Sequence, residues 1–311
     1  MPSLRNSLRA RSPGTLVTCL LALQPSASHA QSIEPRLYSN APVGVNFLIM
    51  GYAYTRGALA TNASLPLTHS KLTTSSAVFG YARVLDFWGK SGKFDAIVPY
   101  SWLSGSAEYA GEPVERDIAG RPDPALRLSV NLYGAPALTL DEFKHYKQDL
   151  IVGASLQVTP PWGQYDHTRL VNLGSNRWSF NPELGISKAI GPLTLELAGA
   201  ATLYTDNRDF MSGHSRSQEP LYSSRGHMIY AFRSGVWASL DAIHFTGGRS
   251  TLDSQVNDDL QRNWRLGLTL ALPVDVHNSV KLFVSRGVAA RTGNNFDLIG
   301  IAWQYRWGGG L

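Results

Sequence analysis

Cysteine is almost absent from the 311-residue chain, since Cys19 is its only example. It lies in a leader-like N-terminal segment, so a mature chain without that leader can form no disulfide, although export would bring it to a compartment where disulfides form. Neither paired cysteines nor an HExxH sequence occurs, so no metal site and no cofactor is expected. The stability of the exported protein must therefore come from its fold.

The chain also lacks a hydrophobic run long enough for a transmembrane helix, which needs about 20 apolar residues. The uncharged stretch 37–55 is interrupted by Pro42, Gly44, Asn46 and Gly51. Charged residues make up only 16% of the chain, whereas it has 29 Gly, 8 Trp and 13 Tyr. This composition excludes a membrane-spanning helix and favours one large all-β domain.

The first 30 residues have the layout of a signal peptide. Three arginines and no acidic residue precede the apolar run 16–23, which is too short to span a bilayer. Ser28 and Ala30 occupy the small-residue positions of a cleavage site. We therefore expect residues 1–30 to be a cleaved signal peptide and residues 31–311 to be the mature domain. Its net charge is then close to zero, which does not indicate a nucleic-acid partner.

Strict alternation of apolar with polar or small residues recurs along the mature chain. In residues 263–272, one face of an extended strand carries Trp264, Leu266, Leu268, Leu270 and Leu272. The intervening residues are polar or small, and 126–133 and 178–187 repeat the pattern. Alternation with a period of two is typical of a β-strand whose two faces meet different environments.

Twelve such segments are expected, and most are long enough to cross a bilayer as tilted strands. They are residues 43–56, 71–85, 93–106, 124–134, 149–159, 177–189, 193–204, 221–233, 235–246, 262–272, 279–291 and 296–307. An open sheet edge cannot be hydrated in hydrocarbon, so the last strand should pair with the first. An even strand number also brings both termini to one side.

The connections alternate between long polar loops and shorter turns, as on the two sides of an outer membrane. The long loops are expected near residues 57–70, 107–123, 160–176, 205–220 and 247–261. Residues 140–148 can form one or two helical turns at the inner mouth, but a solvated connector is the favoured interpretation.

A soluble β-sandwich would show the same alternation, but aromatic residues at strand ends favour a barrel in lipid. In the final strand, Ile299 and Ile301 at mid-strand give way to aromatics at its end. The expected membrane-interface girdle comprises Tyr100, Trp102, Trp178, Trp264, Trp303, Tyr305 and Trp307. We therefore predict an all-β, transmembrane, antiparallel up-and-down barrel of about 12 strands in a Gram-negative outer membrane. Its expected partners are membrane lipid, lipopolysaccharide, the barrel-assembly machinery and a small-molecule solute.

A barrel of this size lies between small, filled barrels and wide aqueous ones. The side chains expected to line its lumen are Asp95, Arg127, Gln157, Glu183, Glu196, Asp241, Arg265, Lys281 and Arg306. The two glutamates and the last three cations would face each other across the lumen, and the resulting field would select small polar or weakly anionic solutes. Alternatively, the same charges pair and plug the lumen.

An enzyme of the outer-membrane lipid hydrolase type is a further alternative, because such barrels use a Ser and a His near the outer rim. His214 with Ser215, and His167, fall in predicted outer loops. Neither histidine has a recognisable nucleophile context or an orienting acid at a telling spacing. We therefore expect no enzymatic activity.

Several stretches resemble the family called "MetA-pathway of phenol degradation". They are LYSNAPVGVNFL (37–48), DPALRLSVNLYGAPAL (123–138), VNLGSNRWSFNPELGISK (171–188), QRNWRLGLTLALP (261–273) and the ending IAWQYRWGGGL. The resemblance covers essentially the whole mature chain and implies an outer-membrane channel associated with the breakdown of aromatic compounds. We therefore expect a barrel that admits small solutes by passive diffusion. The tail 308–311 departs from barrels that end on an aromatic residue.

Overall fold

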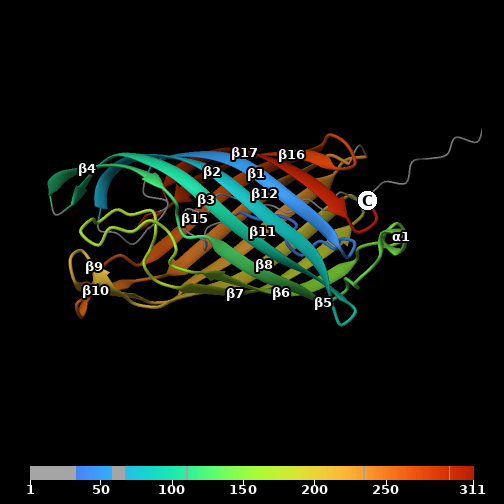
Figure 1. Cartoon of the computed structure of the whole chain (residues 1–311), viewed down its shortest axis with the longest axis horizontal. Helices are drawn as coiled ribbons and strands as arrows, with labels where there is room; N and C mark the ends of the chain where they lie inside the picture. Colours follow the sequence, from blue (N-terminus) through green and yellow to red (C-terminus); the bar gives the residue numbers. More distant parts are fainter. Residues whose placement is uncertain (1–32, 58–66, 110, 234, 294) are drawn as a thin grey trace, which may run out of the picture.

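The computed structural model describes residues 33–57, 67–109, 111–233, 235–293 and 295–311, and the chain is almost entirely β-structure (Figure 1). The predicted leader 1–30 lies outside the described residues. The long strands are β1 (Val45–Gly57), β2 (Leu67–Phe87), β3 (Lys90–Tyr109), β5 (Ala125–Tyr133), β6 (Leu150–Thr159), β7 (Ser179–Ile190), β8 (Leu193–Tyr204), β11 (Leu221–Ala231), β12 (Trp237–Gly247), β15 (Gln261–Pro273), β16 (Asn278–Ala289) and β17 (Phe296–Gly308).

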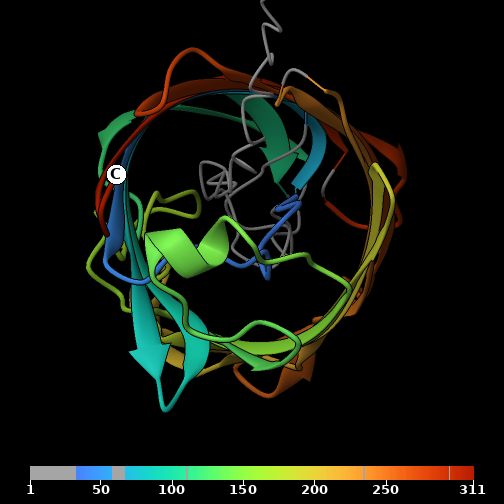
Figure 2. The same cartoon turned by 90° about the vertical axis from the view of Figure 1, so that its right-hand side faces the viewer.

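These twelve strands form a closed antiparallel barrel, as the alternation predicts. Neighbours in the chain are neighbours in the sheet, and β17 pairs with β1 along its full length, from Val45 opposite Gly308 to Gly57 opposite Phe296. The ring of strands is seen end-on in Figure 2. Closure leaves no open sheet edge, which a bilayer would not tolerate.

The polar loops contain strands that the sequence analysis did not predict. β4 (Glu112–Gly120) pairs with the outer part of β3, and β2 begins inside the loop predicted at 57–70. β9 (Asn207–Phe210), β10 (His214–Gln218), β13 (Ser250–Leu252) and β14 (Gln255–Val256) form a separate four-stranded sheet. We call this end of the barrel the loop end, and the end where β1 begins and β17 finishes the terminal end.

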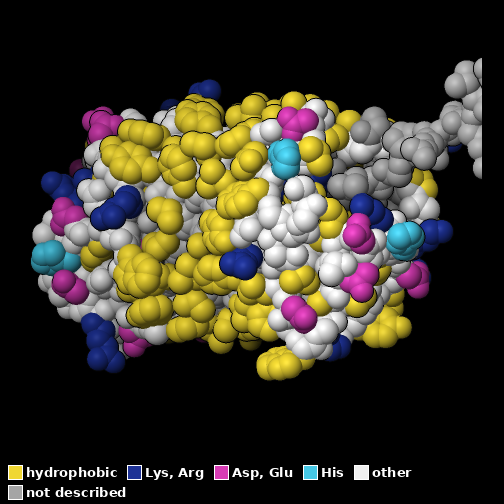
Figure 3. Space-filling model, turned by 45° about the vertical axis from the view of Figure 1, so that its right-hand side comes forward, with side chains coloured by type: hydrophobic (Ala, Val, Ile, Leu, Met, Phe, Trp, Pro, Cys, Tyr) yellow, Lys and Arg dark blue, Asp and Glu magenta, His cyan; other side chains and the backbone are white. Residues whose placement is uncertain are grey.

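The outer face of the barrel is apolar and its inner face is polar. On β15, Leu266 and Leu268 are 43% and 55% exposed, whereas their neighbours Arg265 and Thr269 are buried. Hydrophobic side chains cover much of the visible wall, and most charges lie toward the two ends (Figure 3). This inverts the arrangement of a water-soluble protein and is typical of a barrel surrounded by lipid.

The terminal end is partly covered by a short helix and the C-terminal tail. α1 (Leu140–Phe143) begins with a reciprocal capping box between Thr139 and Glu142, which satisfies free backbone N–H groups. Phe143 is buried and stacks on Tyr146, and Leu311 packs against the same apolar cluster. One helical turn therefore forms within 140–148, where a solvated connector was favoured, and the tail beyond Trp307 folds back onto the helix.

No described helix has the length and apolar character needed to cross a membrane.

Candidate functional site

The lumen contains a stretch of the chain itself, residues 33–41, which we call the N-terminal plug. Each of these residues is buried. In Figure 2, which looks onto the terminal end, the start of the described chain (blue) lies inside the ring of strands. Ile33 packs against Ile243 and Phe245 of β12. Contacts with several strands show that the plug crosses the interior.

The plug is bonded to the inner wall by charged groups. Glu34 forms an ion pair with Arg127 of β5, whose guanidinium also contacts Asp95 of β3 at 3.1 Å. All three side chains are at most 5% exposed. A buried charge of either sign is costly unless it has partners, so this triad holds plug and wall together.

Further bonds tie the plug to β3, β7 and β8. The backbone N–H of Arg36 donates to Glu196 Oε2 at 2.7 Å, and the Tyr38 hydroxyl donates to Glu183 Oε1 at 2.9 Å. Lys93 Nζ donates to the carbonyl of Leu37 at 2.9 Å. The plug is therefore bonded to both glutamates that the sequence analysis assigned to the lumen.

Glycines in the wall make room for the plug. The ring of Tyr38 lies directly against Gly153 of β6 and Gly185 of β7, and a Cβ at either position would overlap it. A Cβ at Gly267 of β15 would similarly overlap Ile33. Glycine removes a side chain where another part of the chain must approach the strand closely. The wall is therefore shaped around this segment.

All nine side chains predicted for the lumen are buried on the inner face of the barrel. Several are satisfied within the wall: Glu183 pairs with Arg225, and Asp241 contacts His227 at 2.7 Å. Arg265 Nη2 donates to Ser285 Oγ at 2.7 Å, and Arg306 Nε donates to the carbonyl of Val276 at 2.6 Å. Glu183 and Glu196 are therefore already bonded, and they do not form an open acidic surface opposite the predicted cations.

Arg225 on β11, Lys93 and the charged residues of the plug were not predicted from the sequence. The signal for Arg225 was present, because it falls at the same alternate positions of its strand as Leu221 and Ile229, and all three are buried. The plug had no such signal, since its residues lie in a turn and in irregular structure rather than in a strand.

The aromatic residues predicted for the girdle occur toward both ends of the barrel. Trp303, Tyr305 and Trp307 stack in succession at the terminal end, with centroids 6.1 and 5.7 Å apart. Those toward the loop end are Tyr100, Trp102, Trp178 and Trp264, which are 39–47% exposed. Their position at a lipid–water interface remains a prediction.

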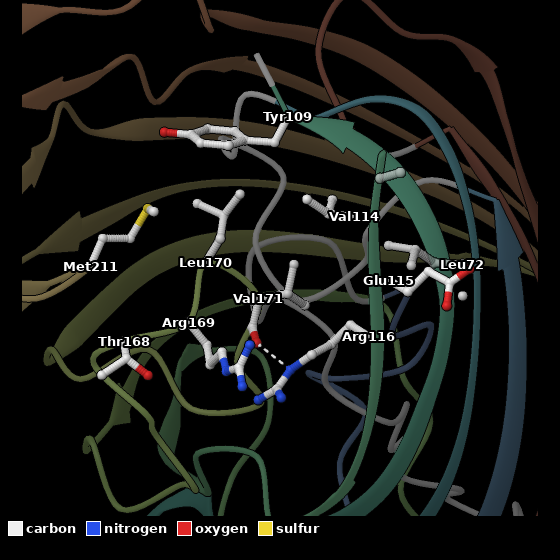
Figure 4. A pocket seen from close by; sticks show the side chains of 12 residues that line it. Leu72, Tyr109, Val114, Glu115, Arg116, Thr168, Arg169, Leu170, Val171 and Met211 are labelled. Atoms are coloured by element: carbon white, nitrogen blue, oxygen red, sulfur yellow. Dashed lines mark hydrogen bonds between the residues drawn. The ribbon is translucent and has the colours of Figure 1, made fainter. Parts of the chain in front are cut away.

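A pocket of about 260 Å³ opens at the loop end, on the inner face of the β2–β3–β4 hairpin (Figure 4). Its opposite side is formed by residues 168–171 and Met211. The apolar part of the lining adjoins a buried cluster that contains Leu72, Val171 and Phe210. Arg116, Arg169 and Glu115 supply its charged groups.

The loops beside this pocket are organised by Asp123. Its carboxylate accepts from the backbone N–H of Gly163 and of Ser175, both at 2.7 Å, and from the Ser175 hydroxyl at 2.6 Å. Burial raises the pKa of Asp123 above its usual range, although these donors act in the opposite direction. One side chain therefore joins the start of β5 to the long loop before β7.

Replacing Asp123 by alanine is expected to loosen this loop, because three donors lose their acceptor. A loss of about 3 kcal/mol would speed amide exchange at Gly163 and Ser175 by roughly 100-fold. Hydrogen–deuterium exchange measures this directly. The matched control is Asp117→Ala, at an exposed position on β4; equal exchange in the two variants would contradict the assigned role.

The histidines considered for hydrolase chemistry are both paired with acids at the loop end. His214 contacts Asp253, and His167 Nδ1 lies 3.2 Å from Asp209 Oδ1. Both rings are more than half exposed. Among the described residues, no serine hydroxyl hydrogen-bonds to either histidine, and no group of three metal-ligating side chains occurs.

Solved structures that resemble this chain include bacterial outer-membrane proteins. The outer membrane channel from Pseudomonas putida F1 has a TM-score of 0.75 and 20% identity, covering 89% of this chain and 100% of that one. The β-domain of the Bordetella autotransporter Brka has a TM-score of 0.47 and 10% identity, covering 84% and 99%. No curated protein sequence matches the chain.

The family resemblance noted from the sequence is confirmed. A family model matches residues 57–305, which is most of the chain and includes every barrel strand from β2 to β16. The chain belongs to the family described as "Putative MetA-pathway of phenol degradation".

Proposed function

We propose that this protein is a channel of the Gram-negative outer membrane that admits small solutes, aromatic compounds among them, by passive diffusion. The observation that carries the proposal is a closed barrel with an apolar outer face around a polar, charged interior. An apolar exterior suits lipid, and a polar interior suits the passage of water and solutes. The shared fold with a solved outer membrane channel supports this reading, and the family description supports aromatic solutes.

The proposal includes the remaining assignments made from the sequence. Residues 1–30 direct export, the nine inward side chains line the pathway, and the seven aromatics border the lipid. Lipid, lipopolysaccharide, the assembly machinery and the solute are the corresponding partners. Because the plug crosses the interior, the structure described is the closed or narrow form of the channel.

A structural barrel with a plugged lumen is the second candidate. The bonds from Glu34, Arg36 and Tyr38 to the wall favour it, because a segment held by several buried bonds leaves slowly. The two functions differ in one measurable respect: only a channel passes solutes while the plug sequence is intact.

Liposome swelling with the purified mature protein tests whether the barrel is a channel or a structural barrel with a plugged lumen. We expect benzoate and arabinose to enter faster than into protein-free liposomes, and the trisaccharide raffinose to be excluded, because a twelve-stranded barrel leaves only a narrow pathway. Swelling in none of the small solutes would reject the channel and leave the structural barrel.

A further inference from the structure

The loop-end pocket has the size of a site for a single aromatic ring. Its volume is about 260 Å³, and an aliphatic cavity of about 150 Å³ already accommodates benzene. It is lined by residues of β2, β3 and β4 at the loop end of the barrel (Figure 4). The remaining volume allows one polar substituent on the ring.

One wall of the pocket is apolar and is held in place by packing. Leu170 and Met211 border the pocket and pack against the buried cluster that contains Leu72 and Phe210. Val114 and Ala107 continue this wall along β4 and β3. Such a surface gains free energy when it removes an apolar ring from water.

Two guanidinium groups from different elements border the same pocket. Arg116 of β4 donates from Nε to the carbonyl of Val171 at 3.1 Å, which fixes its side chain beside the opposite wall (Figure 4). Arg169 extends from the facing loop toward the same side of the pocket. Guanidinium groups recognise carboxylates through paired, charge-assisted hydrogen bonds.

Acids also lie near these arginines. Among the described residues that line the pocket, Glu115 is the single carboxylate, against two arginines. Asp166, outside the lining, forms an ion pair with Arg169, with Nε and Oδ2 3.9 Å apart, and its Oδ1 accepts from the Thr168 N–H and hydroxyl at 2.9 and 2.6 Å. The described lining itself therefore carries a net positive charge.

We propose that this pocket binds a single-ring aromatic carboxylate, with the ring against the apolar wall and the carboxylate between Arg116 and Arg169. The proposal rests on the proposed channel function and narrows its solute to an aromatic anion. The pocket would hold the solute at the loop end before it enters the lumen.

Isothermal titration calorimetry on the full mature protein in detergent micelles tests this site with benzoate, benzyl alcohol and acetate. Benzoate should bind more tightly than either of the others, because only it offers both the ring and the charge. In Arg116→Gln/Arg169→Gln, benzoate affinity should fall by at least about 10-fold, while benzyl alcohol binding stays the same. The Arg116→Lys/Arg169→Lys variant should recover part of the loss, which a merely misfolded loop would not show.

Arg262→Gln is the matched control, since Arg262 is an exposed arginine on β15, away from the pocket lining. Unchanged benzoate affinity in the double glutamine variant, or equal affinity for benzoate and benzyl alcohol, would overturn the proposal. Liposome swelling with the same variants tests the channel function separately from ligand binding in the pocket. Swelling without benzoate binding would leave the channel standing and reject only this pocket.

Discussion

Deleting residues 33–41 is expected to raise the single-channel conductance of the reconstituted protein by about 10-fold or more, because a twelve-stranded wall without a plug encloses an open aqueous path. The plug is buried along its whole length and is bonded to strands on several sides of the lumen. Planar bilayer recording of the purified protein measures the effect.

A single substitution tests the same idea without removing any chain. In Gly185→Val, the new side chain would occupy the place of the Tyr38 ring, so the plug must move and the conductance should rise. Gly199→Val on β8 is the control, because a Cβ at Gly199 has no atom within 4 Å. If folded Gly185→Val conducts no more than the control, the plug does not limit the pathway.

The largest loss of stability is expected from Arg127→Met. The substitution leaves the carboxylates of Glu34 and Asp95 buried without their cation, which costs about 3–5 kcal/mol. Unfolding in urea, followed by the loss of the compact, heat-modifiable band on gels, should show the midpoint falling. The plug should also loosen, since Arg127 is its ionic contact with β5.

Two further variants test whether the burial of the triad causes the loss of stability. Arg286→Met breaks an exposed pair with Asp297, whose side chains are 76% and 62% exposed, and should cost less than about 1 kcal/mol. Replacing Glu34, Asp95 and Arg127 together by apolar residues should restore much of the stability, because the two carboxylates are then no longer buried without Arg127. If Arg127→Met costs no more than Arg286→Met, the buried triad does not stabilise the protein.

The strands of the barrel were predictable because each shows apolar–polar alternation within its own sequence. Alternation in 263–272 and 296–307 identifies β15 and β17, and the need to satisfy edge groups in lipid identifies the partner of β17 as β1. The loop strands β9, β10, β13 and β14 were not predictable. β10 and β13 are distant in the chain, and Arg216 pairs with Leu252, whereas β9–β10 and β13–β14 are short hairpins whose residues do not alternate.

The residues of the candidate site were likewise predictable only in part from the sequence. Inward residues such as Glu183 and Arg265 follow from strand alternation, whereas their partners Arg225 and Ser285 depend on register between strands. The loop-end pocket depends on the approach of β4 to residues 168–171, which no local pattern encodes.

By itself, the sequence determined the fold class, the strands, the apolar exterior and the closing strand pair, because these follow from local periodicity and from the requirement that no backbone group remain unpaired in lipid. Only the tertiary structure decided that the lumen holds residues 33–41 and that its glutamates are bonded by this segment and by Arg225. That outcome depends on which buried groups meet across the barrel, and a buried charge selects its partner by position in space rather than by distance along the chain.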